Sequence, residues 1–356
     1  MALKNLTKNA ISLLKKLIET QSFSSEEDKT ALHIEDWFKN YNIDFKRTKN
    51  NVWAVNKYFD EGKPTLLLNS HHDTVKPNSA YTNDPLKAFV KDGKLFGLGS
   101  NDAGGCLVSL IATFTYFYNE ENLNYNLVIV ASAEEESSGP NGLNSMLSVI
   151  PKVDVAIVGE PTLMNLAVAE KGLVVFDAII EGTPSHAAHP NTNNSIYNTI
   201  EALQWFKNFK FKKGSEALGD VKLTVTQISA GSQHNVVPAH VDLVIDVRVN
   251  DAYSNAEVAQ ILQENAPVTK ITPRSLRLNS SSIPVSHELV KAGIAMGRTT
   301  YGSPTLSDQA VLTCPSLKLG PGDSTRSHSA NEFIYVNEIE EGIEIYIELL
   351  NNVIVK

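Results

Sequence analysis

The sequence predicts an α/β protein that has a mostly parallel central sheet with helices on both faces, and a smaller α+β domain inserted into it. Apolar, strand-like runs alternate with helix-like segments up to residue 171, which is the pattern of a parallel sheet. Over residues 172–280 the order becomes β-α-β-β-α-β, the ferredoxin-like order. The rest returns to the α/β pattern, and a length of 356 residues suits two domains.

The first 41 residues predict two helices. Apolar residues recur at helical spacing between Ile11 and Ile18, and lysines interrupt them, so this is an amphipathic surface helix and not a signal peptide. Ser24 followed by Glu27 matches a capping box, which predicts that a second helix begins there and runs through "DKTALHIEDWFKNY".

The remaining elements follow from the period of the apolar residues. In the larger domain, residues 1–171 and 281–356, strands are predicted at 51–59, 64–73, 126–133 and 153–162, and helices at 104–120 and 337–352. In the inserted domain, residues 172–280, strands are predicted at 173–182, 221–231, 240–249 and 268–273, and helices at 195–209 and 254–266.

The composition excludes several classes of protein. A formal net charge of -9 argues against a nucleic-acid binder, which needs a basic surface. No stretch approaches 18 apolar residues without a charge, so no membrane span is expected. The two cysteines, Cys106 and Cys314, do not make a disulfide framework and favour a reducing compartment, so we expect a cytoplasmic protein.

Histidines and acidic residues stand where the predicted parallel strands end, or in loops beside them. Taken singly, each is explained as a cap or a surface group. Because ligands bind at the carboxyl ends of the strands in open parallel sheets, we expect these side chains to lie close together. The set consists of His71, His72, Asp73, Asp102, Glu134, Glu135, Glu136, Glu160 and His328.

Such a set predicts a metal centre. Several neighbouring carboxylates cannot all stay ionised without compensation, which divalent cations commonly provide. Histidine and carboxylate without cysteine suit zinc, with cobalt or manganese as substitutes, and two metals roughly 3.5–4 Å apart need a bridging carboxylate. A structural calcium site is a poorer explanation, since calcium prefers oxygen ligands. A dinucleotide loop is excluded, because "GLGSNDAGG" has Asp102 at the third glycine position.

Six motifs, in order along nearly the whole chain, resemble those of metallopeptidase family M20, which includes acetylornithine deacetylase and succinyl-diaminopimelate desuccinylase. "SHHDTV" resembles G-H-x-D-T/V-V, "GLGSNDAGG" resembles G-R-G-x-x-D-x-K-G-G, and "AEEESSGPNG" resembles D-E-E with a following glycine turn. "VGEPT" is nearly verbatim, and "GTPSHAAHP" and "GSQHNVVP" resemble the two remaining motifs. The resemblance is closest to acetylornithine-deacetylase-like enzymes, and it implies a zinc-peptidase-like catalytic domain with a lid domain.

The resemblance also implies a role for individual residues. Two Zn²⁺ ions, replaceable by Co²⁺ or Mn²⁺, would be bound by His71, Asp102, Glu136, Glu160 and His328, with Asp102 as the bridge. Catalytic roles fall on Asp73, which orients His71, on Glu135 as the general base, and on His186 as an oxyanion donor. Substrate-binding positions would be Asn235, Arg248, Gly320 and Gly322. Glu135 is chosen as the base and Glu136 as the ligand because Gly139 then falls where the family has its glycine turn. The alternative is a register shifted by one residue.

The activity implied by the resemblance is removal of an acetyl or succinyl group from an N-acyl amino acid, such as N-acylornithine or N-acylcitrulline in arginine biosynthesis. The alternatives are a dipeptidase or aminopeptidase of the same family, a deacylase for N-acyl-lysine or N-acyl-diaminopimelate, and a non-catalytic binding module. An intact Glu135 argues against the last of these, because binding needs no base.

Three further expectations concern the backbone and the assembly. The resemblance implies a cis peptide bond just after Asp102, and a homodimer formed through the inserted domain. Ile196, Ile200, Leu203 and Phe206 are expected on one side of the helix that forms the dimer contact; the alternative is that this side of the helix covers the sheet of its own domain. The alternation in "VDLVIDVRVN" places Arg248 on the polar face of its strand, either paired with Asp246 or free to bind a substrate carboxylate.

Overall fold

A computed structural model describes residues 3–355, which divide into two compact units. The larger unit takes in the chain up to residue 168, then residues 282–301 and the chain from 307 onward. The smaller unit consists of residues 169–281 and 302–306. The chain passes between the units at β8 (Leu166–Glu170), β15 (Ser281–Ser282) and β16 (Thr300–Ser303), and again after Leu306.

A mixed sheet forms the centre of the larger unit, and its middle strands are parallel. The parallel run is β6-β3-β7-β17, formed by Asn126–Ser132, Thr65–His71, Val155–Val158 and Ser316–Lys318. Antiparallel strands flank it, with β2 (Asn51–Val55) and β1 (Phe45–Thr48) beyond β6, and β8 beyond β17. The predicted mostly parallel sheet is confirmed.

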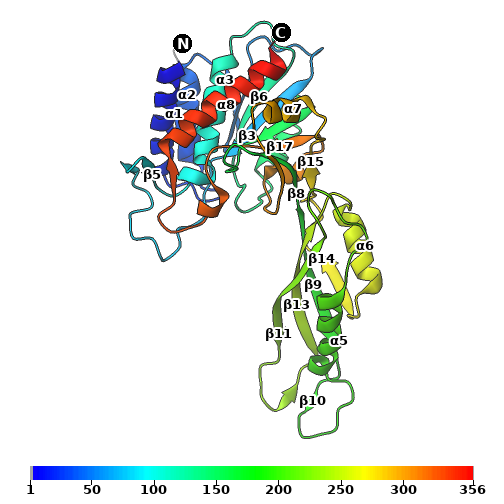
Figure 1. Ribbon diagram of the computed structural model, residues 1–356. Helices are drawn as coiled ribbons and strands as arrows, with labels where there is room; N and C mark the ends of the chain where they lie inside the picture. The colour runs from blue at the N-terminus through cyan, green and yellow to red at the C-terminus, as the bar shows by residue number, and fades with distance from the viewer. Residues whose placement is uncertain (1–2, 356) are drawn as a thin grey trace. The chain divides into compact units, whose positions relative to one another are not determined.

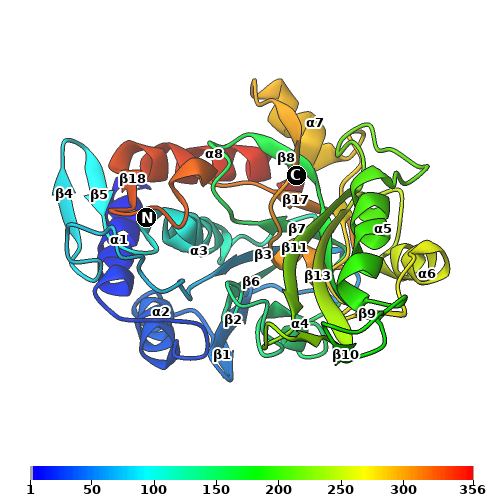
Figure 2. The same cartoon turned by 90° about the horizontal axis from the view of Figure 1, so that it is seen from below.

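Both faces of this sheet carry a hydrophobic core, because its central strands are buried throughout. On β6, Leu127 and Ile129 belong to one core and Val128 and Val130 to the other, as expected when successive side chains point to opposite faces. Figure 2 shows α3 and α8 on one side of β3 and β6 and α4 on the other. The face of the sheet that carries α3 and α8 also carries most of the other long helices. The helices of this unit are α1 (Leu3–Ile18), α2 (Asp28–Asn40), α3 (Gly105–Phe117), α4 (Leu143–Met146), α7 (Glu288–Ala295) and α8 (Val336–Ile354).

Short elements complete the larger unit. A second sheet has the order β18-β5-β4, from Phe333–Tyr335, Lys94–Phe96 and Phe89–Lys91. Three single turns lie in loops: η1 (Ser100–Gly104), η2 (Asp308–Val311) and η3 (Ser324–Arg326). Over residues 3–355, no helix is both long enough and apolar enough to cross a bilayer.

The predicted capping box at α2 is wrong, although the helix itself is confirmed. Ser24 donates its hydroxyl proton to Oδ2 of Asp73 at 2.7 Å and does not cap the helix. Glu27 accepts the backbone amide of Ser25 at 2.6 Å and that of Glu134 at 3.1 Å. Both side chains therefore bind the loops that follow β3 and β6, which are distant in sequence.

The smaller unit has the ferredoxin-like order, as predicted. Its antiparallel sheet runs β11-β13-β9-β14, so the first and third long strands are central. Helices α5 and α6 are drawn beside this sheet in Figure 1, and their apolar residues join the core of this unit. The elements are β9 (Gly172–Glu181), β10 (Ser185–His186), α5 (Ser195–Asn208), β11 (Lys222–Ala230), β12 (Val236–Val237), β13 (His240–Val249), α6 (Asn255–Asn265) and β14 (Lys270–Pro273).

Candidate metal centre

The carboxyl ends of three parallel strands bring most of the acidic residues to one edge of the sheet. His71 is the last residue of β3, and it is paired in register with Ser132, the last residue of β6. Glu134 follows β6 by two residues, and Glu160 follows the end of β7 by two. Because these strands are neighbours in the sheet, the side chains converge as expected.

His71, Glu160 and one oxygen of Asp102 form the first group of possible metal ligands. Nε2 of His71 lies 3.4 Å from Oδ1 of Asp102 and 3.7 Å from Oε1 of Glu160. The His71 side chain is buried, and the two carboxylates are largely so. Oε2 of Glu135 is also close, at 3.8 Å from the same nitrogen.

His328, Glu136 and the other oxygen of Asp102 form the second group. Nε2 of His328 lies 3.0 Å from Oε2 of Glu136 and 3.6 Å from Oδ2 of Asp102. Asp102 thus directs one carboxylate oxygen at each histidine. This is the arrangement that a carboxylate bridging two cations requires.

The state of His71 is what a metal ligand needs. Its Nδ1 lies 3.0 Å from the carbonyl oxygen of Asp73, and since a carbonyl can only accept, Nδ1 carries the proton of the neutral ring. Nε2 then presents its lone pair, and it is buried without a hydrogen-bond partner. A buried polar atom without a partner is unfavourable, and a bound cation would remove that cost. Two sets of side chains have ligand atoms that all lie within 4.8 Å of one another, and neither set contains a cysteine, so the donors are nitrogen and oxygen only: His71, Asp102 and Glu136, and His71, Glu135 and Glu160.

The electrostatics of the cluster also fit a cation. Burial alone lowers the pKa of His71, but the carboxylates of Glu135, Asp102, Asp73 and Glu160 outweigh it and raise that pKa well above its ordinary value. An imidazolium would therefore be the positive charge among these acids, and a divalent cation would displace its proton. The residues present fit a pair of divalent cations.

Asp73 holds more than the imidazole of His71. Its Oδ1 lies 3.4 Å from Nδ1 of His71, and the same oxygen accepts the backbone amide of Glu135 at 3.0 Å. Its Oδ2 accepts the amide of Glu136 at 3.1 Å and the hydroxyl of Ser24. One buried carboxylate therefore fixes the backbone of the loop that carries both glutamates.

Glu135 has the electrostatic character of an acid–base group. Burial raises its pKa well above the ordinary carboxylate value, and although His71 opposes this, repulsion from Glu160, Asp308 and Glu136 adds to it. Its backbone is held by Asp73, while its side chain reaches the first ligand group and accepts no hydrogen bond from another side chain or amide within residues 3–355. A carboxylate with a raised pKa can accept and return a proton near neutral pH.

Two neighbouring residues are directed away from the ligand groups. Both oxygens of Glu134 accept hydrogen bonds. Oε1 accepts from the Ser25 hydroxyl and from the side-chain amide of Asn141, and Oε2 accepts from the backbone amide of Asn141. The ring of His72 contacts Thr30 at 2.8 Å and the carbonyl of Asn50 at 3.0 Å, and burial lowers its pKa to about 4. These contacts favour the register in which Glu135 and Glu136, and His71, face the cluster.

The turn that carries Asp102 is built by backbone contacts. The peptide bond from Asp102 to Ala103 is cis, which confirms the predicted bond. The backbone amides of Gly99, Asn101 and Asp102 all donate to the carboxylate of Glu332, at 3.1, 2.8 and 2.9 Å. Burial and the nearby Asp102 charge raise the pKa of Glu332 to about 8 against the opposing effect of the three amides, and a cation bound by Asp102 would favour the ionised form.

The predicted residues of the smaller unit are described within that unit. His186, on β10, is exposed and is paired in register with Val236, so it stands beside Asn235, whose carbonyl accepts the Ala187 amide at 2.9 Å. Arg248 lies on the polar face of β13 as expected. It forms a bidentate ion pair with Asp246, in which Nε donates to Oδ1 at 2.9 Å and Nη2 donates to Oδ2 at 3.2 Å.

Gly320 and Gly322 are buried, and each has a packing explanation. A Cβ at Gly320 would meet Sγ of Cys106 at 2.6 Å, and a Cβ at Gly322 would meet Oδ1 of Asn101 at 2.5 Å. Gly322 also has a φ of +89°, which glycine adopts without strain. Their proposed contact with substrate stays a prediction.

Two acidic residues near the cluster were not found from the sequence. Asp308, in η2, accepts a hydrogen bond from Ser132 at 2.5 Å, and burial raises its pKa to about 6. Glu332 lies four residues after His328. Neither stands at the end of a predicted strand, so the reasoning that found the other acids did not reach them.

Comparison with known proteins gives the same result as the geometry. The family model for peptidase family M20/M25/M40 matches residues 67–352. A succinyl-diaminopimelate desuccinylase from Rickettsia akari is 25% identical, over 96% of this chain and 98% of its own, and an acetylornithine deacetylase from Shigella sonnei is 27% identical, over 98% and 99%. A dinuclear metal-binding peptidase of family M20 from Bacillus subtilis has a TM-score of 0.75 at 16% identity, covering 98% of each chain.

A buried cluster of histidine and carboxylates, in a chain that matches this family over residues 67–352, defines a metal-dependent hydrolase. The chain belongs to peptidase family M20/M25/M40, which confirms the family that the motifs resemble.

Proposed function

We propose that the chain removes the acyl group from an N-acyl amino acid with the help of two divalent cations, Zn²⁺ first. The observation that carries the proposal is the division of Asp102 between two ligand groups, with Glu135 beside them. The first cation would be held by His71, Asp102 and Glu160, and the second by Asp102, Glu136 and His328. Co²⁺ and Mn²⁺ would be functional substitutes.

The chain's own groups would move the proton and hold the substrate. When bound, the cations would supply Lewis acidity and lower the pKa of the attacking water. Glu135 would take a proton from this water, whose oxygen adds to the acyl carbon, and the partner subunit's His186 would donate a hydrogen bond to the developing oxyanion. The carbon–nitrogen bond then breaks, Glu135 returns the proton to the leaving amine, and a carboxylate and a free amino acid are released.

The raised pKa of Glu135 supports this role. A base that is to collect a proton and later deliver it works best when its pKa lies near the operating pH. Burial and three neighbouring acids move the pKa of Glu135 in that direction. Asp73 would keep the base in place through the Glu135 amide and keep His71 in its ligand tautomer.

The substrate is proposed to be an N-acetyl or N-succinyl amino acid, such as N-acylornithine or N-acylcitrulline in arginine biosynthesis. The relative named acetylornithine deacetylase supports this choice, at 27% identity. The relatives named succinyl-diaminopimelate desuccinylase support the alternative of an N-succinyl-diaminopimelate or N-acyl-lysine substrate. We place the reaction in the cytoplasm, where the free thiols of Cys106 and Cys314 would stay reduced.

A peptidase is the second candidate function, because solved structures with the same fold include peptidases of this family. The test is release of free amine by the Zn²⁺-loaded protein. Substrates would be the N-acetyl and N-succinyl forms of ornithine, citrulline, lysine and diaminopimelate, with a dipeptide and a tripeptide alongside. Deacylation without peptide cleavage is expected; faster cleavage of the peptides would make the chain a peptidase.

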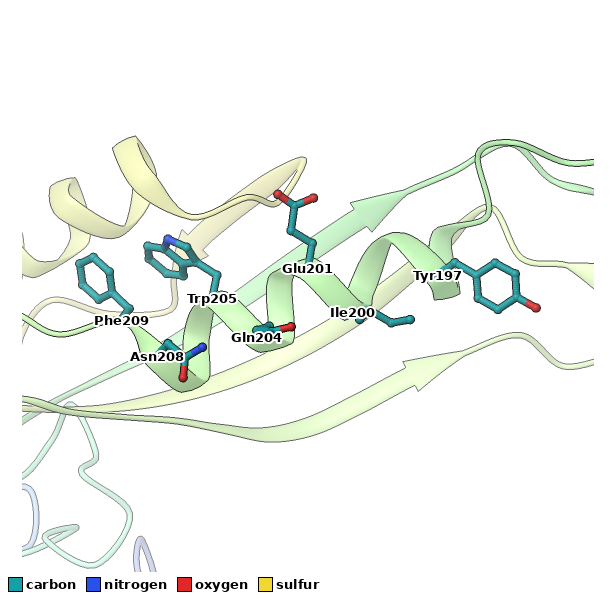
Figure 3. A pocket seen from close by; sticks show the side chains of 7 residues that line it. All are labelled: Tyr197, Ile200, Glu201, Gln204, Trp205, Asn208 and Phe209. Carbon is teal, nitrogen blue, oxygen red and sulfur yellow. The ribbon is translucent and has the colours of Figure 1, made fainter.

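We further propose that the smaller unit mediates a homodimer. Ile196 and Ile200 on α5 are exposed, and the edge strand β11 exposes Ile228. Figure 3 shows the groove along α5 that Tyr197, Ile200, Trp205 and Phe209 line, with polar neighbours. A second copy could cover both the helix and the edge strand by two-fold symmetry.

The stripe predicted on α5 is corrected by the burial of its residues. Phe206 is buried in the core of the smaller unit and Leu203 packs against that core, whereas Ile196 and Ile200 are exposed. The four residues therefore do not share one face, and the dimer contact is proposed for the N-terminal half of α5.

A further inference from the structure

Glu332 is a buried acid that the proposed reaction does not use. Its side chain belongs to a residue only 2% exposed, just before β18. Both of its oxygens accept backbone amides: Oε2 from Gly99, and Oε1 from Asn101 and Asp102. Three amides from one turn on one carboxylate make a closed anion site that the chain fills with its own residue.

These amides lie outside α3, which begins at Gly105: Gly99 precedes η1, and Asn101 and Asp102 belong to it. The turn itself is irregular, because Asp102 has φ −116° and ψ 99°, outside the helical range. Glu332 therefore supplies what the local backbone cannot, and its loss would leave buried amides without an acceptor.

The position of this contact matters because Asp102 faces two ways. Its Oδ1 is directed at His71 and its Oδ2 at His328. A small rotation of the Asp102 backbone would turn one oxygen away from its histidine. The amide of Asp102 is itself one of the three that Glu332 holds.

We propose that Glu332 is a positioning residue that orients Asp102 as the bridge between the two cations. The inference rests on the metal centre proposed above and adds the group that holds its bridge in place. Glu332 touches neither cation nor substrate; it acts through the Asn101 and Asp102 amides. It also links the bridge to the loop of His328, since His328 and Glu332 are four residues apart.

A matched control lies in the same part of the chain. Glu338 also accepts a backbone amide, that of Tyr335 at 3.0 Å, and it pairs with Arg326 at 2.7 and 3.0 Å. Replacing Glu338 would remove a structural carboxylate from the first turn of α8 without touching the Asp102 turn.

The test compares Glu332→Gln with Glu338→Gln. Glutamine has the shape of glutamate, but its NH₂ group would face amide donors. Co²⁺ is titrated into the metal-free full-length proteins, and binding is followed by visible absorption and by competition with a chelator. Mutation of a residue that holds a metal ligand in place typically lowers the metal affinity about 10–100-fold. We expect Glu332→Gln to weaken Co²⁺ binding in that range and to change the absorption spectrum, and Glu338→Gln to do neither.

The outcomes separate this inference from the metal centre itself. Unchanged Co²⁺ affinity and spectrum in a folded Glu332→Gln protein would overturn the role of Glu332. Failure of the wild-type protein to bind Co²⁺ would instead overturn the metal centre.

A second measurement needs no variant, so it holds if Glu332→Gln does not fold. Amide hydrogen exchange is measured by NMR on the wild-type protein with and without Zn²⁺. We expect the amides of Gly99, Asn101 and Asp102 to be protected without metal and to slow further when metal binds, because the coupling between the two is reciprocal. The Tyr335 amide should not respond. Exchange at the rate of exposed loops, or no response to Zn²⁺, would count against the proposal.

Discussion

Replacing Glu135 by glutamine tests the proposed base. Glutamine keeps the size of the side chain and removes its ability to take a proton. General acid–base catalysis typically contributes about 10²–10⁴-fold, so we expect kcat to fall by at least about 10², or about 2.7 kcal/mol. Both metal sites should stay filled, because Asp102, Glu136, Glu160 and the histidines supply the ligands without Glu135.

The pH profile gives a second sign of the same role. The base acts when it is deprotonated, so activity is lost as the pH falls through its pKa. Burial and the neighbouring acids raise the pKa of Glu135 and the bound cations would offset part of that shift, so the acid limb of kcat/KM reports the pKa of Glu135 in the metal-loaded protein. The residual activity of Glu135→Gln should lack this limb.

The assay is steady-state deacylation across pH, with metal content measured on the same samples. Glu134→Gln is the matched control, because Asn141 and Ser25 hold that carboxylate away from the ligand groups, and it should keep most of the activity. Loss of a metal from Glu135→Gln would make Glu135 a ligand. Loss of activity from Glu134→Gln with metal retained would refute the chosen register.

The other predictions concern residues around the base. Asp73→Asn should weaken metal binding about 10–100-fold, because it removes the carboxylate charge beside His71 and weakens the acceptor of the Glu135 and Glu136 amides, although the backbone carbonyl contact to His71 remains; chelator competition measures this, and unchanged affinity would contradict it. Arg248→Lys should lower kcat/KM about 10-fold or more, because lysine lacks the planar fork, and less for a substrate with an amidated α-carboxylate; wild-type behaviour on both would show that Arg248 serves only its pair with Asp246. The family resemblance implies that, in the proposed dimer, His186 of one copy reaches the active site of the other. His186→Ala and Glu135→Gln should therefore each be inactive and should regain activity when mixed, because one site of the mixed dimer has both groups intact; no recovery after verified subunit exchange would count against a shared site.

The larger architecture could be predicted because its strands are buried on both faces. Continuous apolar runs such as the one that ends at His71 identify central parallel strands, and the acids that follow them must then meet at one edge. The alternation in β13 likewise placed Arg248 on the polar face. In these cases the local pattern and the tertiary structure agree.

Contacts between distant segments could not be predicted in this way. Ser24 and Glu27 match the capping-box pattern, but in the structure Ser24 donates to Asp73 and Glu27 accepts the Glu134 amide instead of capping the helix. Glu332 accepts backbone amides from a turn some 230 residues earlier in the chain, and the sequence around Glu332 has no pattern that predicts this contact. The helical spacing on α5 could not tell residues that face their own core from residues left exposed.

The Arg248 pair shows a third limit. The sequence left open whether this side chain was paired or free, because Asp246 stands two residues away on the same face of the strand. The pair is formed in the structure, with two contacts. A substrate carboxylate would have to displace Asp246 from Arg248. The role of Arg248 is therefore tested by comparing substrates with a free and an amidated α-carboxylate.

Anomalous diffraction at the zinc edge, from crystals of the Zn²⁺-loaded protein, tests the proposed metal centre most directly. Two peaks roughly 3.5–4 Å apart are predicted, one beside His71 and Glu160, the other beside Glu136 and His328, with Asp102 between them. The absence of zinc at these residues, or a single ion away from Asp102, would contradict the account.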